Sequence, residues 1–410
     1  MSEEFMMKNV SIEDAVAALL ESASLPGVED VSLSDACGRV LGNSITAQTD
    51  LPPFHRSVYD GFALRSSETI HASAKSPAAF RLTGTIAAGD FHADPPGEGC
   101  AVRIMTGAAL PEGTDCVINF ERVTCTEQML YLTDPLRPWQ NVDRRGDELR
   151  EGSLLLEKGE YLTPAHLGLL ASQGFSRVTV FKKPCTAVLS TGSELLMPGT
   201  ALAPGKIYNS NLYVLRALME KEGYTADDCL HTPDDEEIIS SAIRNLAERN
   251  DLILTTGGAS VGDKDYILSA LKRAGAQILF SHVRMKPGSC CYGAKLGDTL
   301  IISLSGNPGA ALTAWYRIAL SAVRKSTGRR DFLLSESMLP LSDDCQKTCP
   351  HQRILKGHTE TADGVTRFVA HEGQKNGMQT SFLHMQALAE LSPTDIPIPA
   401  GTLVRVLFPY

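Results

Sequence analysis

One stretch constrains the fold of this chain more than any other: an apolar segment runs directly into a turn rich in hydroxyls and glycines, followed by acids. Residues 250–266 have the sequence NDLILTTGGASVGDKDY. Glycines let a backbone approach a ligand closely, and successive N–H groups can hold phosphate oxygens. The order is typical of a parallel strand that ends at an anion site. Asp263 and Asp265 are candidate metal ligands.

Two further segments repeat this order of an apolar run, a hydroxyl and a glycine. They are residues 187–195, AVLSTGSEL, and residues 300–309, LIISLSGNPG. A glycine pair at one strand end is often purely steric. Ligands of open α/β sheets, however, bind outside the carboxyl ends of the strands, so three such ends in one region predict a single pocket.

Length and charge narrow the class of protein. A chain of 410 residues exceeds one ordinary core, and its net charge of −10 argues against nucleic acid as the main partner. No apolar run reaches the roughly 20 residues that cross a bilayer, and the first residues lack the pattern of a signal peptide, so we expect a cytoplasmic protein without membrane contact. The ten cysteines are scattered, which favours free thiols. Cys345, Cys349 and His351 form only a weak metal pattern, for which His358 is one possible fourth ligand.

The pattern of the chain predicts four domains, one of them discontinuous. Ser11 is placed to cap a helix that packs or dimerises, and a second helix opens at Pro164. Short β-like runs form one part of the sequence. Alternating strands and helices come after them, and a β-rich tail ends the chain. The predicted domains are an N-terminal or dimerisation domain of residues 1–48 and 140–180, an inserted small β domain of 49–139, an α/β domain of 181–330, and a C-terminal β domain of 331–410.

Three more segments complete a signature: residues 51–63, LPPFHRSVYDGFA, residues 100–115, CAVRIMTGAALPEGTD, and residues 204–211, PGKIYNSN. Together with the three loops, they resemble in sequence order the molybdopterin molybdenumtransferase family, the MoeA proteins and the E domain of gephyrin. The resemblance covers residues 5–410. It implies an elongated, multidomain α/β plus β subunit with a central molybdopterin-binding domain. It also implies a homodimer whose active site lies between the α/β domain of one subunit and the small β domain of its partner.

The family reaction that this resemblance implies is insertion of molybdate into adenylylated molybdopterin, with release of AMP and use of a divalent cation such as Mg²⁺. The molybdopterin adenylyltransferase is then the expected upstream partner. The resemblance assigns catalytic roles to Asp60, Thr106, Glu194 and Asp265, and assigns metal or molybdate handling to Asp60 and Glu194. The residues expected to bind the pterin nucleotide are Asp234, Thr256, Gly257, Gly258, Ser260, Lys286, Ser305, Gly306, Asn307 and Pro308.

Several positions depart from the usual family pattern. His55 and Arg56 replace an aspartate and an asparagine, Ser193 replaces an aspartate, and Ser305 replaces a proline. The loss of two carboxylates and the gain of two potential cations predict stronger anion binding, with an effect on the metal requirement or on the oxyanion accepted.

Three alternatives remain open at this point. One is a catalytically weak paralogue that acts as a gephyrin-like scaffold, although Asp60, Thr106, Glu194 and Asp265 argue against it. Another is a nucleotide hydrolase of the competence-damage type, which shares the α/β module but leaves residues 51–63 and 100–115 unexplained. The last is tungstate insertion, because tungstate and molybdate are nearly equal in size and charge.

Overall fold

The computed structural model describes residues 7–90, 94–259 and 265–409. The chain forms two compact units. The first contains residues 1–43, 158–163 and 177–410, and the second contains residues 44–157 and 164–176. Each unit has cores and sheets of its own.

A seven-stranded sheet organises the first unit, in the order β1-β19-β21-β22-β18-β14-β17. The central strands β22, β18, β14 and β17 are parallel, whereas β21 is antiparallel to both of its neighbours. The strands are β1 (Met7–Val10), β14 (Cys185–Thr191), β17 (Thr225–Thr232), β18 (Leu252–Thr256), β19 (Gln277–Val283), β21 (Tyr292–Leu296) and β22 (Thr299–Leu304). The mixed sheet with a parallel centre confirms the predicted α/β class.

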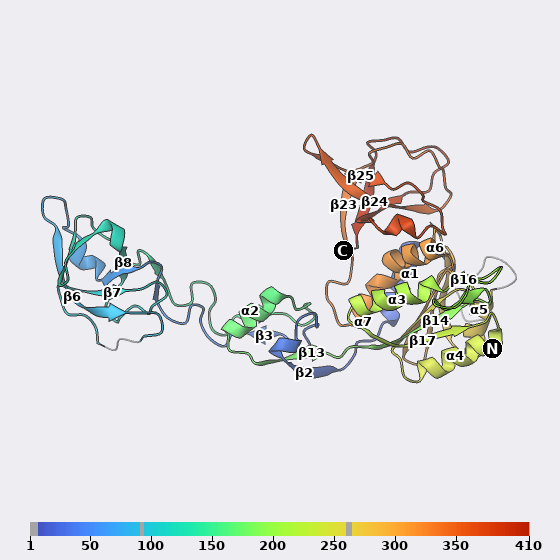
Figure 1. The fold of residues 1–410 in the computed structure, drawn as a ribbon, viewed down its shortest axis with the longest axis horizontal. Coiled ribbons are helices and arrows are strands. Elements are labelled where there is room, and N and C mark those ends of the chain that lie inside the picture. Colours follow the sequence, from blue (N-terminus) through green and yellow to red (C-terminus); the bar gives the residue numbers. More distant parts are fainter. Residues whose placement is uncertain (1–6, 91–93, 260–264, 410) are drawn as a thin grey trace. The chain divides into compact units, whose positions relative to one another are not determined.

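Helices cover both faces of this sheet (Figure 1). Alternating residues of β18 show why: Leu252 and Leu254 enter one apolar core, whereas Ile253 enters the other. The first core also receives α1 (Ile12–Ser22), α3 (Ser210–Lys221), α6 (Pro308–Ala314), a π-helical turn (Trp315–Ala319) and α7 (Leu320–Ser326). The second receives α4 (Glu236–Ala247) and α5 (Tyr266–Ala274).

The N-terminus corrects part of the predicted domain division. Residues 1–48 were expected to pack with residues 140–180, yet β1 pairs in parallel with β19 of the large sheet. Ser11 caps α1 as predicted, accepting the N–H of Asp14 at 3.0 Å, and Ile12 and Leu19 are fully buried in the α/β core. Burial of this apolar helix face therefore determines where the N-terminus belongs, and the remaining domain boundaries stay a prediction.

The C-terminal part of the first unit is a six-stranded sheet (Figure 1). Its strands are β20 (Met285–Lys286), β23 (Ser335–Pro340), β24 (Gln352–Ala362), β25 (Val365–Ala370), β26 (Ala387–Leu391) and β27 (Leu403–Phe408). The 3₁₀ turn η5 (Thr380–Phe382) lies between β25 and β26. One face of this sheet has its own core around Leu355 and Phe368. Ile354 and Leu388 on the other face join the α/β core, so the two sheets share packing.

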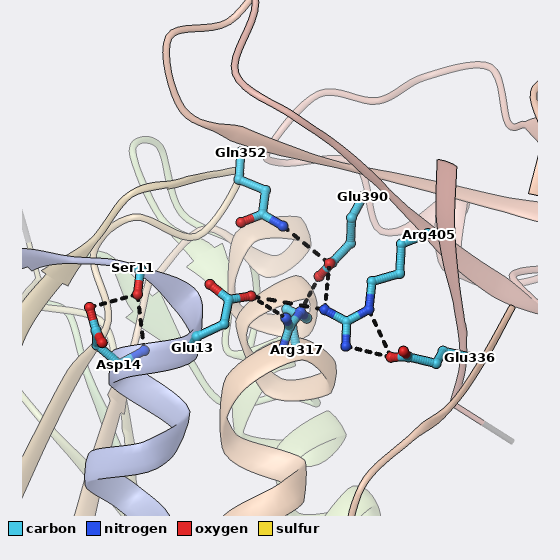
Figure 2. A network of polar contacts seen from close by, with 8 residues as sticks. All are labelled: Ser11, Glu13, Asp14, Arg317, Glu336, Gln352, Glu390 and Arg405. Carbon is cyan, nitrogen blue, oxygen red and sulfur yellow. Dashed lines mark hydrogen bonds and ion pairs between the residues drawn. The ribbon is translucent and has the colours of Figure 1, made fainter. Parts of the chain in front are cut away.

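An ion-pair network reinforces this contact (Figure 2). The Arg317 guanidinium contacts Glu390 and lies 3.1 Å from Glu13 on α1. Glu390 also accepts hydrogen bonds from Gln352 at 3.1 Å and from Arg405 at 3.4 Å. Glu390 is nearly fully buried, with 3% of its side chain exposed. A buried carboxylate with several cationic and amide donors is satisfied only while the C-terminal sheet stays in place.

Smaller ribbons complete the first unit. Strands β2 (Val28–Ser32) and β13 (Arg177–Phe181) are antiparallel, and β15 (Leu195–Leu196) pairs in parallel with β16 (Ile207–Tyr208).

The second unit is built on a six-stranded sheet in the order β8-β5-β7-β6-β10-β9. These strands are β5 (Gly61–Leu64), β6 (Ala78–Ile86), β7 (Cys100–Ile104), β8 (Cys116–Asn119), β9 (Thr124–Cys125) and β10 (Met129–Leu132). Phe62, Phe80 and Leu130 contribute to its core. The unit also contains β3 (Ile45–Thr46) paired with β12 (Leu154–Leu156), β4 (Arg56–Ser57) paired with β11 (Val142–Asp143), and α2 (Pro164–Ser172), which begins at the predicted proline.

Candidate active site

The three hydroxyl- and glycine-rich loops meet at one cavity of about 300 Å³ at the carboxyl ends of β14, β18 and β22. The lining brings together the predicted residues Glu194, Asp234, Thr256, Gly257, Gly258, Ser305, Gly306, Asn307 and Pro308. Parallel neighbours end at the same edge of a sheet, which is why segments far apart in sequence converge here. The predicted Ser260 and the candidate metal ligand Asp263 lie outside the described residues.

Glycine allows the loops to touch backbone to backbone. Gly257 has φ 96°, and a Cβ atom built there would lie 2.0 Å from the Thr191 carbonyl oxygen. Gly258 has φ 63°, and its Cβ would lie 2.7 Å from Thr191 Oγ1. Both positions therefore require a residue without a side chain, both for conformation and for space.

Gly257→Ala is expected to lower the free energy of unfolding by about 3 kcal/mol, because strain at positive φ adds to a clash with backbone. Gly275→Ala is the matched control. Gly275 also has a positive φ, of 85°, but a Cβ there meets no atom within 4 Å. The control should therefore lose only about 1 kcal/mol from its left-handed backbone. Urea unfolding of both variants measures the difference, and equal losses would show that the Thr191 contact is unimportant.

Two asparagines at the start of α3 hold the loops together. Asn211 Nδ2 donates to Thr256 Oγ1 at 2.8 Å and to the Gly306 carbonyl at 2.9 Å. Thr256 Oγ1 in turn donates to the Ser305 carbonyl at 3.0 Å. Asn209 caps α3 and donates to Ser190 Oγ at 2.6 Å. These contacts fix the spacing of the strand ends around the cavity.

Residues 204–211 are one of the sequence motifs, yet the sequence alone predicts no role for any single residue within this motif. The lining residues missed in this way, and in the neighbouring loops, are Thr191, Gly192, Leu195, Ile207, Tyr208, Asn209, Ser210, Asn211 and Ala259. The one available signal was a pair of amides directly at the start of a helix.

Two carboxylates face the cavity. Glu194 is exposed at the loop after β14, and Asp234 follows β17. Asp234 Oδ2 accepts the Ser193 N–H at 3.3 Å, and the Asp234 N–H donates to Ser193 Oγ at 3.2 Å. Nine buried side-chain atoms of the described residues have no hydrogen-bond partner, and two of them, Asp234 Oδ1 and Thr191 Oγ1, belong to residues that line the cavity. Buried polar atoms are rarely left unpaired, so these two mark where a polar ligand fits.

Asp265 and Lys286 do not line this cavity. Asp265 caps α5, accepting the Leu268 N–H at 3.2 Å through Oδ1, while its Oδ2 accepts the hydroxyl of the buried Tyr292. Burial raises the pKa of Tyr292, and its hydrogen bond to Asp265 raises that pKa further. Lys286 is exposed on β20. The roles predicted for Asp265 and Lys286 therefore stay predictions.

Asp60 and Thr106 are paired within the second unit. Thr106 donates to Asp60 Oδ1 through its N–H at 2.7 Å and through its hydroxyl at 2.8 Å. The pKa of Asp60 lies below its ordinary value. The main cause is the hydrogen bond from the Thr106 N–H, the next is the hydrogen bond from the Thr106 hydroxyl, and the charge of Arg103 lowers the pKa further. Asp60 is thus kept ionised and has its second oxygen available for a cation or a donor.

The positions that depart from the family pattern have defined surroundings. Arg56 Nε lies 3.0 Å from Asp143 Oδ2, which offsets its charge. His55 accepts the Arg145 N–H at 3.0 Å through Nδ1. Ser193 makes the reciprocal pair with Asp234, and Ser305 Oγ accepts the Asn307 N–H at 3.3 Å. Stronger anion binding at these positions remains a prediction. The charge of Arg56 is already offset by Asp143.

Comparison with known proteins gives matches over most of the chain. Residues 10–174 match the MoeA N-terminal region (domain I and II), and residues 187–325 match a probable molybdopterin binding domain. A protein of Staphylococcus aureus (strain COL) named molybdopterin molybdenumtransferase is 31% identical over 399 residues, covering 97% of this chain and 95% of that protein. The chain belongs to the molybdopterin molybdenumtransferase family.

Other members of the molybdopterin molybdenumtransferase family agree. A Staphylococcus epidermidis protein of the same name is also 31% identical, with 97% of this chain and 95% of that protein covered. Two crystal structures of a molybdopterin biosynthesis MoeA protein from Pyrococcus horikoshii match with TM-scores of 0.81 and 0.82 at 27% and 25% identity. They cover 98% of this chain and 99% and 100% of theirs. The resemblance inferred from the motifs is confirmed. The prediction of an enzyme of molybdenum cofactor biosynthesis is confirmed with it.

Within the described ranges, no group of three or more His, Cys, Asp or Glu side chains is already arranged to hold a metal ion, the weak Cys345, Cys349 and His351 pattern included. No helix among the residues that the structure describes is long and apolar enough to span a membrane.

Proposed function

We propose that this chain inserts molybdate into adenylylated molybdopterin and releases AMP. The observation that carries the proposal is the cavity of the three loops, in a chain whose relatives are named molybdopterin molybdenumtransferase. Its walls offer backbone N–H groups, hydroxyls and amides, which are the donors that a pterin phosphate and a phosphoanhydride need. The unpaired Thr191 Oγ1 and Asp234 Oδ1 supply further polar contacts.

A divalent cation, Mg²⁺ in this proposal, fits the acids present. Magnesium usually takes only one or two protein carboxylates and completes its shell with water and substrate phosphates. Glu194 and Asp234 provide two carboxylates within the cavity lining. The metal role predicted for Asp60 is a separate proposal. When bound, the cation would neutralise charge on the phosphoanhydride and on the oxyanion. The residues of the loops would orient the nucleotide and hold its phosphates.

The deciding experiment measures AMP release from adenylylated molybdopterin by the purified full-length protein, by chromatography. Molybdate, tungstate and Mg²⁺ are each added or omitted. We expect release that requires both an oxyanion and Mg²⁺, and the ratio of the two oxyanion rates decides between molybdate and tungstate. Tight binding of the nucleotide without release would instead favour the scaffold alternative.

The ionisation of Asp60 provides a pH test. Thr106→Val keeps the backbone donor but removes the hydroxyl that lowers the pKa of Asp60. The carboxylate then protonates at a higher pH, so the acidic limb of the rate profile should move to higher pH. Thr106→Ser retains a hydroxyl and should retain the original limb. Identical acidic limbs in the two variants would show that Asp60 ionisation does not control the rate.

We also propose that the protein works as a cytoplasmic homodimer and receives its substrate from the molybdopterin adenylyltransferase. Family membership supports both statements. Light scattering after gel filtration tests the dimer, with twice the mass of the chain expected. Pull-down with the purified adenylyltransferase, in the presence of its nucleotide product, tests the partner.

A further inference from the structure

A second hollow, of about 330 Å³, lies in the C-terminal sheet and is lined by histidines. His358 is on β24, and His371 follows β25, the antiparallel neighbour of β24. The His371 N–H donates to the Lys356 carbonyl at 2.9 Å, which continues the pairing beyond β25. Residues 356, 358, 369 and 371 therefore share one face of the sheet. The lining consists of His358, Ala370, His371, Glu372, Thr380, Ser381 and His384.

The two strand histidines have fixed partners on one side of each ring. His371 Nδ1 lies 3.0 Å from the Ser381 carbonyl, which only accepts, so Nδ1 carries the proton. His358 Nε2 lies 2.9 Å from Glu360 Oε1, which likewise makes that nitrogen the donor. In the neutral rings, His371 Nε2 and His358 Nδ1 keep their lone pairs. A histidine whose other nitrogen donates to a carbonyl or a carboxylate is the usual form of a metal ligand.

The rings are also close to one another. Their centroids are 5.3 Å apart with planes at 36°. Two protonated imidazoles at this separation repel, whereas one cation bound between them would attract both lone pairs. Glu372 adds a carboxylate to the lining, and His384 adds a third imidazole.

The nearby lysine, Lys356, is not among the residues that line the hollow. Lys356 is fully buried on β24, its Nζ has no hydrogen-bond partner and lies 4.9 Å from the Phe382 ring centroid. The ionisable groups that line the hollow are thus Glu372 and the three imidazoles.

We propose that this hollow binds one divalent transition-metal ion through His358 and His371, with His384 and Glu372 completing the coordination. Imidazole nitrogens suit zinc, nickel and copper ions. His358 and His371 are already adjacent. Among the described residues, no three metal-ligating side chains converge on one point, so His384 or Glu372 must rotate when the ion binds. Both are exposed and free to do so.

Such an ion would act on the segment that connects the hollow to the cavity. Between His371 and His384, the Gln379 side chain donates to Ser210 Oγ at 2.6 Å, and the Asn376 carbonyl accepts the Ala310 N–H at 3.2 Å. Ser210 lines the cavity of the three loops, and Ala310 lies in the first turn of α6. A bound metal would therefore anchor a segment that contacts the proposed active site.

The test is calorimetric titration of Ni²⁺ into the full-length protein, stripped with a chelator and kept reduced, without any pterin or nucleotide. We expect one equivalent per chain, weakened at least about tenfold in His358→Gln and in His371→Gln. His71→Gln alters an exposed histidine of the second unit that is outside the hollow, and this variant should bind as the unaltered protein does. Unchanged thermal unfolding of the metal-free variants confirms that they fold.

Cobalt provides a second measurement, because the ten cysteines could also bind metal. Co²⁺ in the hollow should give ligand-field absorption without thiolate charge-transfer bands. Should either His→Gln variant fail to fold, His384→Gln, which alters an exposed side chain, replaces it in both experiments. Equal Ni²⁺ affinity in the histidine variants, or a thiolate spectrum, would overturn the proposal. Neither result bears on AMP release, so the proposed transferase activity stands or falls separately.

Discussion

Glu194→Gln should lower the rate of oxyanion-dependent AMP release about a hundredfold, the order of loss seen when one preorganised electrostatic group is removed from an active site. The substitution keeps the size of the side chain and removes only the charge that would hold the cation. Nucleotide affinity should change little, because the loops that donate to the phosphates are untouched. Rapid-quench measurement of AMP formation, with binding measured separately, distinguishes the two effects.

The matched control for this variant is Glu237→Gln, an exposed glutamate on α4 outside the cavity lining. It should leave both rate and affinity unaltered. Raising the Mg²⁺ concentration should restore part of the lost rate in Glu194→Gln if the carboxylate acts through the cation. A normal rate at normal Mg²⁺ in that variant would remove Glu194 from the proposed mechanism.

Glu390→Ala should lower the free energy of unfolding by about 3–5 kcal/mol, as expected when one partner of a buried ion pair is removed. The change leaves the Arg317 guanidinium, only 10% exposed, without its buried carboxylate, and also removes an acceptor from Gln352 and Arg405. Arg317 keeps Glu13, but that side chain is 58% exposed and its ion pair is weaker for that reason. Urea unfolding followed by circular dichroism measures the loss.

Glu336→Ala is the comparison for the same network. Its side chain is 49% exposed and contacts Arg405 at the surface, so a loss below about 1 kcal/mol is expected. The double variant Arg317→Met with Glu390→Leu should recover much of the stability, because it removes both buried charges together. If Glu390→Ala were no more harmful than Glu336→Ala, the network would contribute little to holding the C-terminal sheet.

The sequence predicted those parts of the site that local patterns encode. Thr256, Gly257 and Gly306 lie at or just after the ends of apolar strands, and the parallel arrangement of β18 and β22 is enough to bring them together. Asn211 and Tyr208 could not be placed in the same way. Their position depends on where α3 packs, and its buried Leu212 and Leu215 give the contact face but not the neighbour.

The N-terminus shows a second limit. Residues 7–10, MKNV, are short and mostly polar, so they carry little strand signal of their own. They form β1 because the edge of β19 offers free backbone groups for parallel pairing, with Val10 opposite Val283. Tertiary pairing outweighs local preference at this position. Lys286 illustrates the same point for the site, since a motif position alone did not bring it to the cavity lining.

The backbone contacts of the loops also bear on how this enzyme can change over generations. The close approach of Gly257 to Thr191 and of Gly306 to Gly257 fixes the distance between the walls together with the hydrogen bonds of Asn211. Substitutions such as serine for acid at position 193 then alter charge and hydrogen bonding while the dimensions of the cavity persist. Shape and charge are thus inherited through different residues, and selection can exchange one oxyanion or cation preference for another without rebuilding the fold.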